Sequence, residues 1–201
     1  KYTPVATTDV PDVLPYHRRF GTTDYLFAIN DRREYGTYVG QHGLVMENGL
    51  PAQATLTVRR TGHVYDLLAQ REVTTDATNE AISLPVTLEP GGGRLFMVTD
   101  QPVAAVNVSG PETAAPGSQA HFKVTVADSS GTPVNAVVPV ELTIRDTDGR
   151  VAEFSGYYGA ASGQLDIPLD IAPNDTPGMW TIKAREMASG QETLLFFRVG
   201  A

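Results

Sequence analysis

The sequence has no cysteine, a single tryptophan, and only 15 basic residues against 23 acidic ones in 201 residues, which gives a net charge of −8 and a pI near 4.9. Without cysteine the chain can form no disulfide framework, no thiolate metal site and no cysteine nucleophile. The deficit of basic residues argues against nucleic acid and against an anionic membrane as partners. Any core must therefore be held by apolar packing alone.

Long apolar runs are also missing. No stretch approaches the roughly 18 consecutive apolar residues of a membrane-spanning helix, so we expect no membrane insertion. No apolar 3.6-residue period lasts for three turns, so we expect little helix. The sequence opens at Lys1 without a basic-then-apolar signal segment, and we interpret the chain as a piece of a larger protein.

What the sequence does contain is a series of short strand patterns separated by turn residues. Residues 1–23 carry three prolines and no strand or helix period, which predicts an extended lead-in along a domain. Strand patterns begin at Asp24, and a second series starts after Pro102. We place the domain boundary there, which predicts an accessory-type sandwich over 24–102 and a second sandwich over 103–201.

The second half shows the alternation most clearly. Seven short strands in about a hundred residues, with Asp, Asn, Ser and Gly in the gaps, are typical of an immunoglobulin-like sandwich. The predicted fold class is therefore all-β: two tandem antiparallel β-sandwiches, the second immunoglobulin-like with seven strands. The strands predicted in this half are 103–109, 119–127, 137–145, 151–158, 164–169, 178–186 and 191–199.

The first half carries loose motifs of a known accessory domain. An aromatic-Asp pair at Tyr65-Asp66, the strand pattern of 82–88 and the Pro90-Gly91 turn before 94–98 resemble the C-terminal β-sandwich appended to glycoside hydrolase barrels. The resemblance covers residues 24–100. It implies an accessory sandwich without catalytic carboxylates, because those of the enzymes belong to the barrel.

The second half, residues 103–201, is similar to bacterial immunoglobulin-like and α2-macroglobulin-like domains. The similarity lies in Pro116-Gly117 before a strand, in the stretches 128–134 and 140–149, and in the Asp-Thr-Pro-Gly-Met-Trp-Thr-Ile run of 175–182. It implies a spacer or adhesion role in a large multidomain protein outside the cytoplasm.

Residues that could carry chemistry form no recognisable motif. The four histidines are scattered, and the acids lie mainly in turns, where Asp146 and Asp148 with Gly149 match only the start of a calcium loop. The Gly91–Gly93 run joins no strand to a helix, and Gly-x-Ser-x-Gly is absent. We predict no catalytic residue, no metal site and no cofactor. An enzyme would instead need a cleft between the domains with a pair of acids in it.

Two segments are predicted to make contacts. Residues 31–51 form a Gly-rich excursion whose Tyr, Arg and His side chains are types found at binding surfaces, and which alternatively frames one extra hairpin. The last strand is apolar on both faces, so Leu194 and Phe196 are predicted to meet another domain. The predicted contact residues of the excursion are Arg32, Arg33, Tyr35, Tyr38 and His42.

The function that these patterns favour is not catalytic. We expect a structural and interaction fragment of a larger secreted, periplasmic or surface protein, whose sandwiches act as spacers or protein-contact modules. Its expected partners are the other domains of the parent protein. The alternative is a carbohydrate-binding accessory module of a glycoside hydrolase-like protein.

Overall fold

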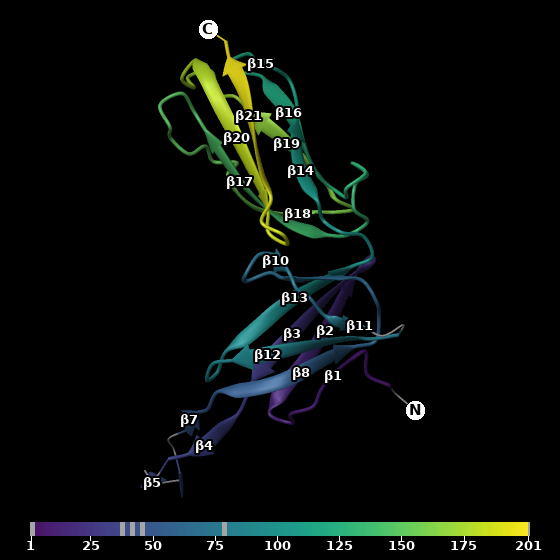
Figure 1. The fold of residues 1–201 in the computed structure, drawn as a ribbon. Helices are drawn as coiled ribbons and strands as arrows, with labels where there is room; N and C mark the ends of the chain where they lie inside the picture. Colours follow the sequence, from purple (N-terminus) through teal and green to yellow (C-terminus); the bar gives the residue numbers. More distant parts are fainter. Residues whose placement is uncertain (1–2, 37–38, 41–42, 45–46, 78–79, 201) are drawn as a thin grey trace. The chain divides into compact units, whose positions relative to one another are not determined.

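The computed structural model describes residues 3–200 apart from 37–38, 41–42, 45–46 and 78–79 (Figure 1). The described residues form strands and turns with no helix, so the predicted all-β class is confirmed, and none of these residues forms a helix able to span a membrane. The structure divides into two compact units, residues 1–19 with 24–100, and residues 20–23 with 101–201.

The first unit contains two main antiparallel sheets. Their strand orders are β1-β8-β12-β11 and β10-β9-β13-β3-β2. Residues between β3 and β8 add two small hairpin sheets, β4 with β7 and β5 with β6. The strands are β1 (Ala6–Thr8), β2 (Val13–Phe20), β3 (Thr23–Asn30), β4 (Arg33–Tyr35), β5 (Val39–Gly40), β6 (Gly43–Leu44), β7 (Glu47–Gly49), β8 (Ala52–Val58), β9 (His63–Asp66), β10 (Arg71–Glu72), β11 (Asp76–Ala77), β12 (Ile82–Leu88) and β13 (Gly93–Thr99).

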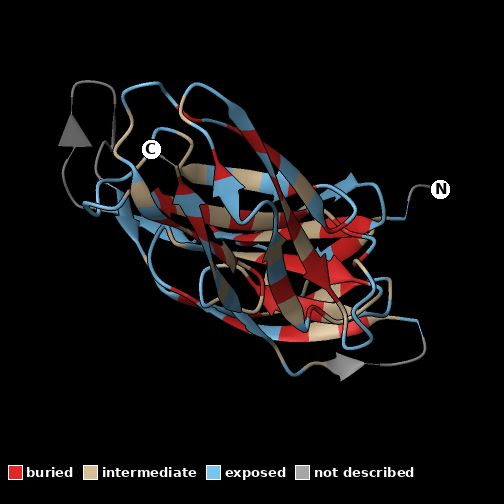
Figure 2. Cartoon of the chain, turned by 90° about the horizontal axis from the view of Figure 1, so that it is seen from above, coloured by how far each residue is buried: buried red, intermediate tan, exposed pale blue. Residues whose placement is uncertain are grey.

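The core of this unit lies between its two main sheets. Leu56 of β8 pairs with Leu84 of β12, and both are completely buried with Leu26 of β3 and Val98 of β13. Because side chains alternate across a strand, every second residue of β8 and β12 is buried and the residues between them are more exposed. Stretches of buried and exposed residues alternate along the strands of the chain (Figure 2). Burial of apolar surface, about 25 cal/mol for each Å², therefore holds the two sheets together.

Residues 1–23, expected as an extended lead-in, contribute two of these strands. β1 pairs with β8, and β2 forms the edge of its sheet beside β3. Val13 is completely buried, but the other positions of β2 are half-buried or exposed. An edge strand with so few buried positions needs little apolar periodicity, which explains why the sequence pattern did not reveal it.

Pro85 lies at a place in the sheet that tolerates proline. It pairs with Thr55 of β8, and β11 on the other side of β12 reaches only Ile82 and Ser83. Proline cannot donate to a ladder, so it is accepted where one side of the strand has no partner. Although β12 lies between β8 and β11, Pro85 is therefore at a part of the strand that, among the described residues, has no neighbour on one side.

The second unit is a sandwich of a three-stranded sheet, β14-β16-β19, and a five-stranded sheet, β15-β21-β20-β17-β18. Neighbouring strands are antiparallel except β15, which runs parallel to β21. Its strands are β14 (Ala105–Ser109), β15 (Thr113–Ala114), β16 (Gln119–Ala127), β17 (Val138–Arg145), β18 (Gly156–Ala160), β19 (Gln164–Asp170), β20 (Gly178–Glu186) and β21 (Glu192–Val199).

The seven strands predicted for this half are therefore present, with the two-residue β15 in addition. The fourth begins at Gly156 rather than at Val151, because the chain turns at 152–155, where Ser155 N donates to Ala152 O at 3.0 Å. Three aromatic rings join the two sheets: the centroid of Phe197 lies 4.8 Å from that of Phe122 and 5.9 Å from that of Trp180. The indole Nε1 of Trp180 donates to Thr176 O at 2.9 Å, so this buried ring leaves no unpaired polar atom.

Candidate functional site

The outer side of the five-stranded sheet gathers exposed apolar and basic side chains, and we call it the basic-apolar face. Strand pairing arranges it in rows: Glu141, Arg185 and Glu192 lie across from one another, as do Thr143, Lys183 and Leu194. The face comprises Glu141, Thr143, Arg145, Tyr157, Met179, Thr181, Lys183, Arg185, Glu192, Leu194, Phe196 and Arg198.

Leu194 and Phe196 stand on this face, where 51% and 54% of their surfaces are exposed. Their neighbour Phe197 points to the other side of β21 and is completely buried. Met179, on β20, is also exposed. Exposed apolar side chains that stand together mark contact surfaces more often than single ones do. The pair named from the sequence as contact residues is thus placed on an open face.

The charges of the face differ from those of the rest of the unit. Residues 103–201 contain 6 basic and 11 acidic residues, and the face holds four of the basic ones but only Glu141 and Glu192 among the acidic ones. The cations are Arg145, Lys183, Arg185 and Arg198. A unit that is acidic as a whole therefore presents one locally basic surface.

The two acids of the face already have partners within it. Lys183 Nζ lies 2.7 Å from Glu192 Oε2, and Tyr157 Oη lies 3.3 Å from Glu141 Oε1. The hydrogen bond from Lys183 lowers the pKa of Glu192, helped by the positive charge of Arg185. By contrast, Arg185 Nε is buried without a hydrogen-bond partner. Arg185 is thus paired with neither acid of the face.

A shallow hollow of about 400 Å³ lies on the face. It is lined by Glu141, Thr143, Arg145, Thr181, Lys183, Arg185 and Leu194. Three cations and one apolar side chain thus border the same space, while Arg145 also donates from Nη1 to Gly149 O at 2.8 Å. This combination can receive a carboxylate next to an apolar group.

The opposite outer face, on β14, β16 and β19, provides a comparison within the same unit. Its outward positions include Asn107, His121, Lys123 and Asp166, and among the described residues no large apolar side chain is exposed on it. The two outer faces of one sandwich therefore differ in both apolar exposure and charge.

The 31–51 excursion forms a hairpin extension of the first unit. Tyr35 lies across from Glu47, and 64% of its surface is exposed. Arg33 Nη1 lies 2.7 Å from Glu47 Oε2, and Arg32 Nη1 donates to Pro51 O at 3.2 Å. Both arginines thus have contacts within the extension. Tyr38 and His42, also named from the sequence, lie outside the described residues.

The base of this extension is fixed by Asn30, which is buried at the end of β3. Its Nδ2 donates to Leu50 O at 2.8 Å and to Glu89 O at 2.9 Å, and its Oδ1 accepts from Arg32 N at 3.0 Å. Leu50 N also donates to Arg32 O at 2.9 Å. The chain therefore leaves and re-enters the sandwich at one point.

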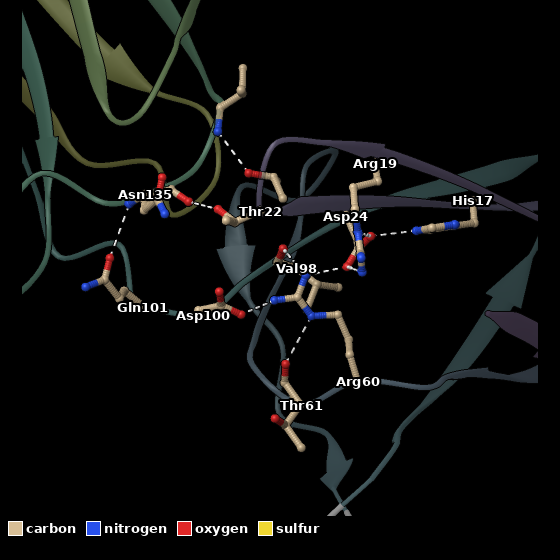
Figure 3. Close-up of polar contacts among 12 residues, drawn as sticks. His17, Arg19, Thr22, Asp24, Arg60, Thr61, Val98, Asp100, Gln101 and Asn135 are labelled. Atoms are coloured by element: carbon tan, nitrogen blue, oxygen red, sulfur yellow. Dashed lines mark hydrogen bonds and ion pairs between the residues drawn. The ribbon is translucent and has the colours of Figure 1, made fainter.

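The sequence did not reveal a buried charge cluster around Asp24 in the first unit (Figure 3). The Asp24 carboxylate is completely buried and meets His17 at 2.6 Å, Arg19 at 2.7 Å and Arg60, which also pairs with Asp100. Burial alone would raise the pKa of Asp24, but the hydrogen bonds from Arg19, His17 and Arg60 lower it far below its usual value. The signal present in the sequence was Gly21 with Thr22, which form the two-residue connection between β2 and β3, and Gly21 has a φ of 58°.

The carboxylates of the second unit's loops stabilise turns. Asp146 Oδ1 accepts from Asp148 N at 2.9 Å and from Arg150 N at 2.8 Å, and Asp175 Oδ2 accepts from Ala172 N at 2.7 Å. Both acids border a hollow of about 440 Å³ beside Trp180. Across the described part of the chain, no three His, Asp or Glu side chains are grouped so that they could hold a metal ion.

The strand order of the second unit, with three strands facing five and β15 parallel to β21, defines an immunoglobulin-like β-sandwich. No protein-family model matches the sequence, and no curated protein matches it. The predicted accessory-domain membership of residues 24–100 therefore has no support from a sequence family.

Three solved structures illustrate the range of similar folds. A PKD domain of an M14-like peptidase from a Thermoplasmatales archaeon is 17% identical over 50% of this chain and 98% of its own, with a TM-score of 0.33. A superoxide reductase from Ignicoccus hospitalis is 14% identical over 48% of this chain and 81% of its own, with a TM-score of 0.34. The adhesin InvE of Yersinia pseudotuberculosis is 15% identical over 90% of this chain, with a TM-score of 0.39, and the chain spans 55% of its length.

Proposed function

We propose that the chain is a non-catalytic pair of β-sandwich modules of a larger extracytoplasmic protein, and that its contact surface is the basic-apolar face. The observation that carries the proposal is the exposure of Leu194 and Phe196 on the same side of β21, opposite the side that bears the buried Phe197. This pair lies outside the core of its own unit, which contains Phe197 and Trp180.

The non-catalytic part of the proposal is supported by the hydrogen bonds and ion pairs of the carboxylates. Asp146 and Asp175 hold turns, Glu192 pairs with Lys183, and Asp24 is enclosed by cations. None of these carboxylates is placed as an open acid-base pair. Turnover of a glycoside or peptide that disappears with one substitution in this chain would contradict the proposal.

The absence of cysteine allows a direct test of the contact surface. A single reporter cysteine at Gln191, beside the basic-apolar face, can be labelled with a fluorophore, and a matched cysteine at His121 reports on the opposite face. In the complete gene product, with any cysteine outside these 201 residues replaced by serine, we expect the label at position 191 to be shielded from iodide quenching and the label at 121 to stay accessible. Equal quenching at both positions, in the isolated chain and in the complete product, would contradict the proposed surface.

A second candidate function is carbohydrate binding by the 31–51 extension, as in an accessory module. It is favoured by the exposed ring of Tyr35, which stands two residues from Arg33 on the same strand. Calorimetric titration of oligosaccharides against the wild-type chain and Tyr35→Ala separates the two candidates. Heat that is lost with Tyr35→Ala supports carbohydrate binding, and absence of heat with the wild type excludes it for the sugars used.

A further inference from the structure

We propose that the basic-apolar face takes an acidic polypeptide segment that carries a large apolar side chain. This inference rests on the proposed contact function and adds the chemistry of the partner. It follows from three properties of the face: its charge, the donors that remain available, and the apolar side chains that stand among them.

The first property is charge complementarity. Four cations and two acids stand on the face, whereas the rest of residues 103–201 contains two basic and nine acidic residues. An acidic segment is attracted to this face and repelled by the remaining surface of the unit, and this difference selects both the partner and its position. A basic segment would be attracted everywhere except here.

The second property is the set of donors that are still available. Glu192 forms an ion pair with Lys183, and Glu141 accepts a hydrogen bond from Tyr157, so both acids of the face have partners within it. Arg185 and Arg145 both border the hollow, and neither is paired with one of these two acids. A guanidinium binds a carboxylate through charge-assisted hydrogen bonds, so an Asp or Glu side chain in the hollow can pair with one of these arginines.

The third property is the apolar part of the face, which excludes a simple anion as the full ligand. Leu194 borders the hollow, and Phe196 follows on the same side of β21. Covering their aliphatic and aromatic surfaces favours binding only when the ligand brings an apolar group to cover them. Acidic polysaccharides have few such groups, whereas a polypeptide can place a Phe or Leu between carboxylates.

The spacing of the face also suits an extended chain. Alternate residues of one strand are about 6.6 Å apart, and neighbouring strands are about 4.8 Å apart. The three rows headed by Glu141, Thr143 and Arg145 therefore extend over about 13 Å, the length of four extended residues. Such a segment can place one carboxylate near Arg185 and an apolar side chain near Leu194 or Phe196.

The experiment uses synthetic nine-residue peptides and the whole 201-residue chain labelled with ¹⁵N. The first peptide alternates Glu and Asp around a central Phe, the second replaces each acid by its amide, and the third replaces Phe by Ala. We expect the acidic Phe peptide to shift amide signals of β17, β20 and β21 but not those of β16 and β19. We expect its affinity to fall at least tenfold when the acids become amides, and severalfold when Phe becomes Ala or when salt is raised to 0.5 M.

Matched variants assign the binding to the residues argued above. Arg145→Gln with Arg185→Gln is expected to lower the affinity at least tenfold, and Leu194→Ser with Phe196→Ser to remove the advantage of the Phe peptide over the Ala peptide. Lys123→Gln, on the opposite face, is the control. It is expected to change neither the affinity for the acidic peptide nor the advantage of the Phe peptide over the Ala peptide. Thermal unfolding of each variant verifies that it is folded.

Several outcomes would overturn the inference. These are absence of shifts with the acidic peptide, equal binding of the amide peptide, or shifts centred on β16 and β19. Tighter binding of a sulfated oligosaccharide at the same residues would assign the face to another class of ligand, and concentration-dependent dimerisation through it would assign it to a second copy of the chain. The cysteine reporters distinguish the proposed contact surface from the proposed acidic partner. Shielding at position 191 without binding of the acidic peptide would retain the contact surface and reject the acidic partner.

Discussion

Arg19 holds Asp24 through two parallel hydrogen bonds, from Nε to Oδ1 at 2.7 Å and from Nη2 to Oδ2 at 2.9 Å. His17 and Arg60 complete the enclosure of this buried carboxylate. The cluster joins the consecutive strands β2 and β3 to Arg60, which follows β8 and lies 36 residues from Asp24 in sequence. The cluster therefore cross-links these parts of the first unit by ion pairs, in a chain that has no disulfide.

The first prediction concerns removal of this carboxylate's charge. Asp24→Asn leaves Arg60 nearly buried beside a neutral group, and breaking a buried ion pair costs about 3–5 kcal/mol. The control is Asp100→Asn, which removes an exposed carboxylate from the same Arg60 and is expected to cost less than about 1 kcal/mol. Urea unfolding of the three proteins measures the difference. Equal losses for the two variants would show that the cluster does not stabilise the unit.

The second prediction concerns the stability of the chain at acidic pH. Because the folded-state pKa of Asp24 is lowered, the stabilisation by its charge is complete above the unfolded pKa of about 3.9 and is lost as the pH falls below that value. The free-energy difference between wild type and Asp24→Asn should therefore shrink between pH 5 and about pH 2.5. The lowered pKa values of Asp9 and Asp128 add acid sensitivity to both proteins alike, so they cancel in this comparison. A difference that stays constant over the range would contradict the assignment.

The third prediction uses two neighbouring phenylalanines. Phe197→Ala empties a position in contact with Phe122 and Trp180 and is expected to cost about 3–5 kcal/mol. Phe196→Ala removes an exposed ring and is expected to change the free energy of unfolding by no more than about 0.5–1 kcal/mol. Denaturant titration checks both. A large loss from Phe196→Ala would mean that this ring stabilises the unit itself, which would weaken the case for a contact surface.

The fourth prediction concerns the turn between β20 and β21. The buried carboxylate of Glu186 accepts from Ala188 N at 2.9 Å, from Gln191 N at 2.7 Å and from both N and Oγ of Ser189. Glu186→Gln keeps the size but loses the charge and one acceptor oxygen, so we expect a loss of about 2–3 kcal/mol. Hydrogen exchange of the turn amides should accelerate with it. Glu192→Gln on the same hairpin, an exposed position, is the control and should leave the turn protected.

The strands could be predicted where burial alternates cleanly. β16, β17 and β20 each bury every second residue, so their apolar period is visible in the sequence. β2 is an edge strand with one fully buried residue, and its pattern is correspondingly absent. Local patterning thus reveals a strand only to the extent that the strand is buried on one side.

The candidate site was predictable in part for the same reason. The run 194–197 is apolar on both sides of a strand, which indicated that Leu194 and Phe196 would face outward. The basic residues around them come from β17 and β20, and only the register of these strands brings Arg145, Lys183 and Arg185 beside the pair. The Asp24 cluster was hidden in a similar way, because Arg60 approaches it from 36 residues away.

The clamp formed by Asn30 has a consequence for how the first unit can vary. Since one side chain binds both Leu50 O and Glu89 O, the ends of the 31–51 extension are joined at the sandwich irrespective of what lies between them. Closing a longer loop costs little additional entropy, about 0.6 kcal/mol for each doubling of its length. We therefore expect the sandwich to tolerate replacement of the segment between Arg33 and Gly49, which would make it a scaffold for the display of foreign loops.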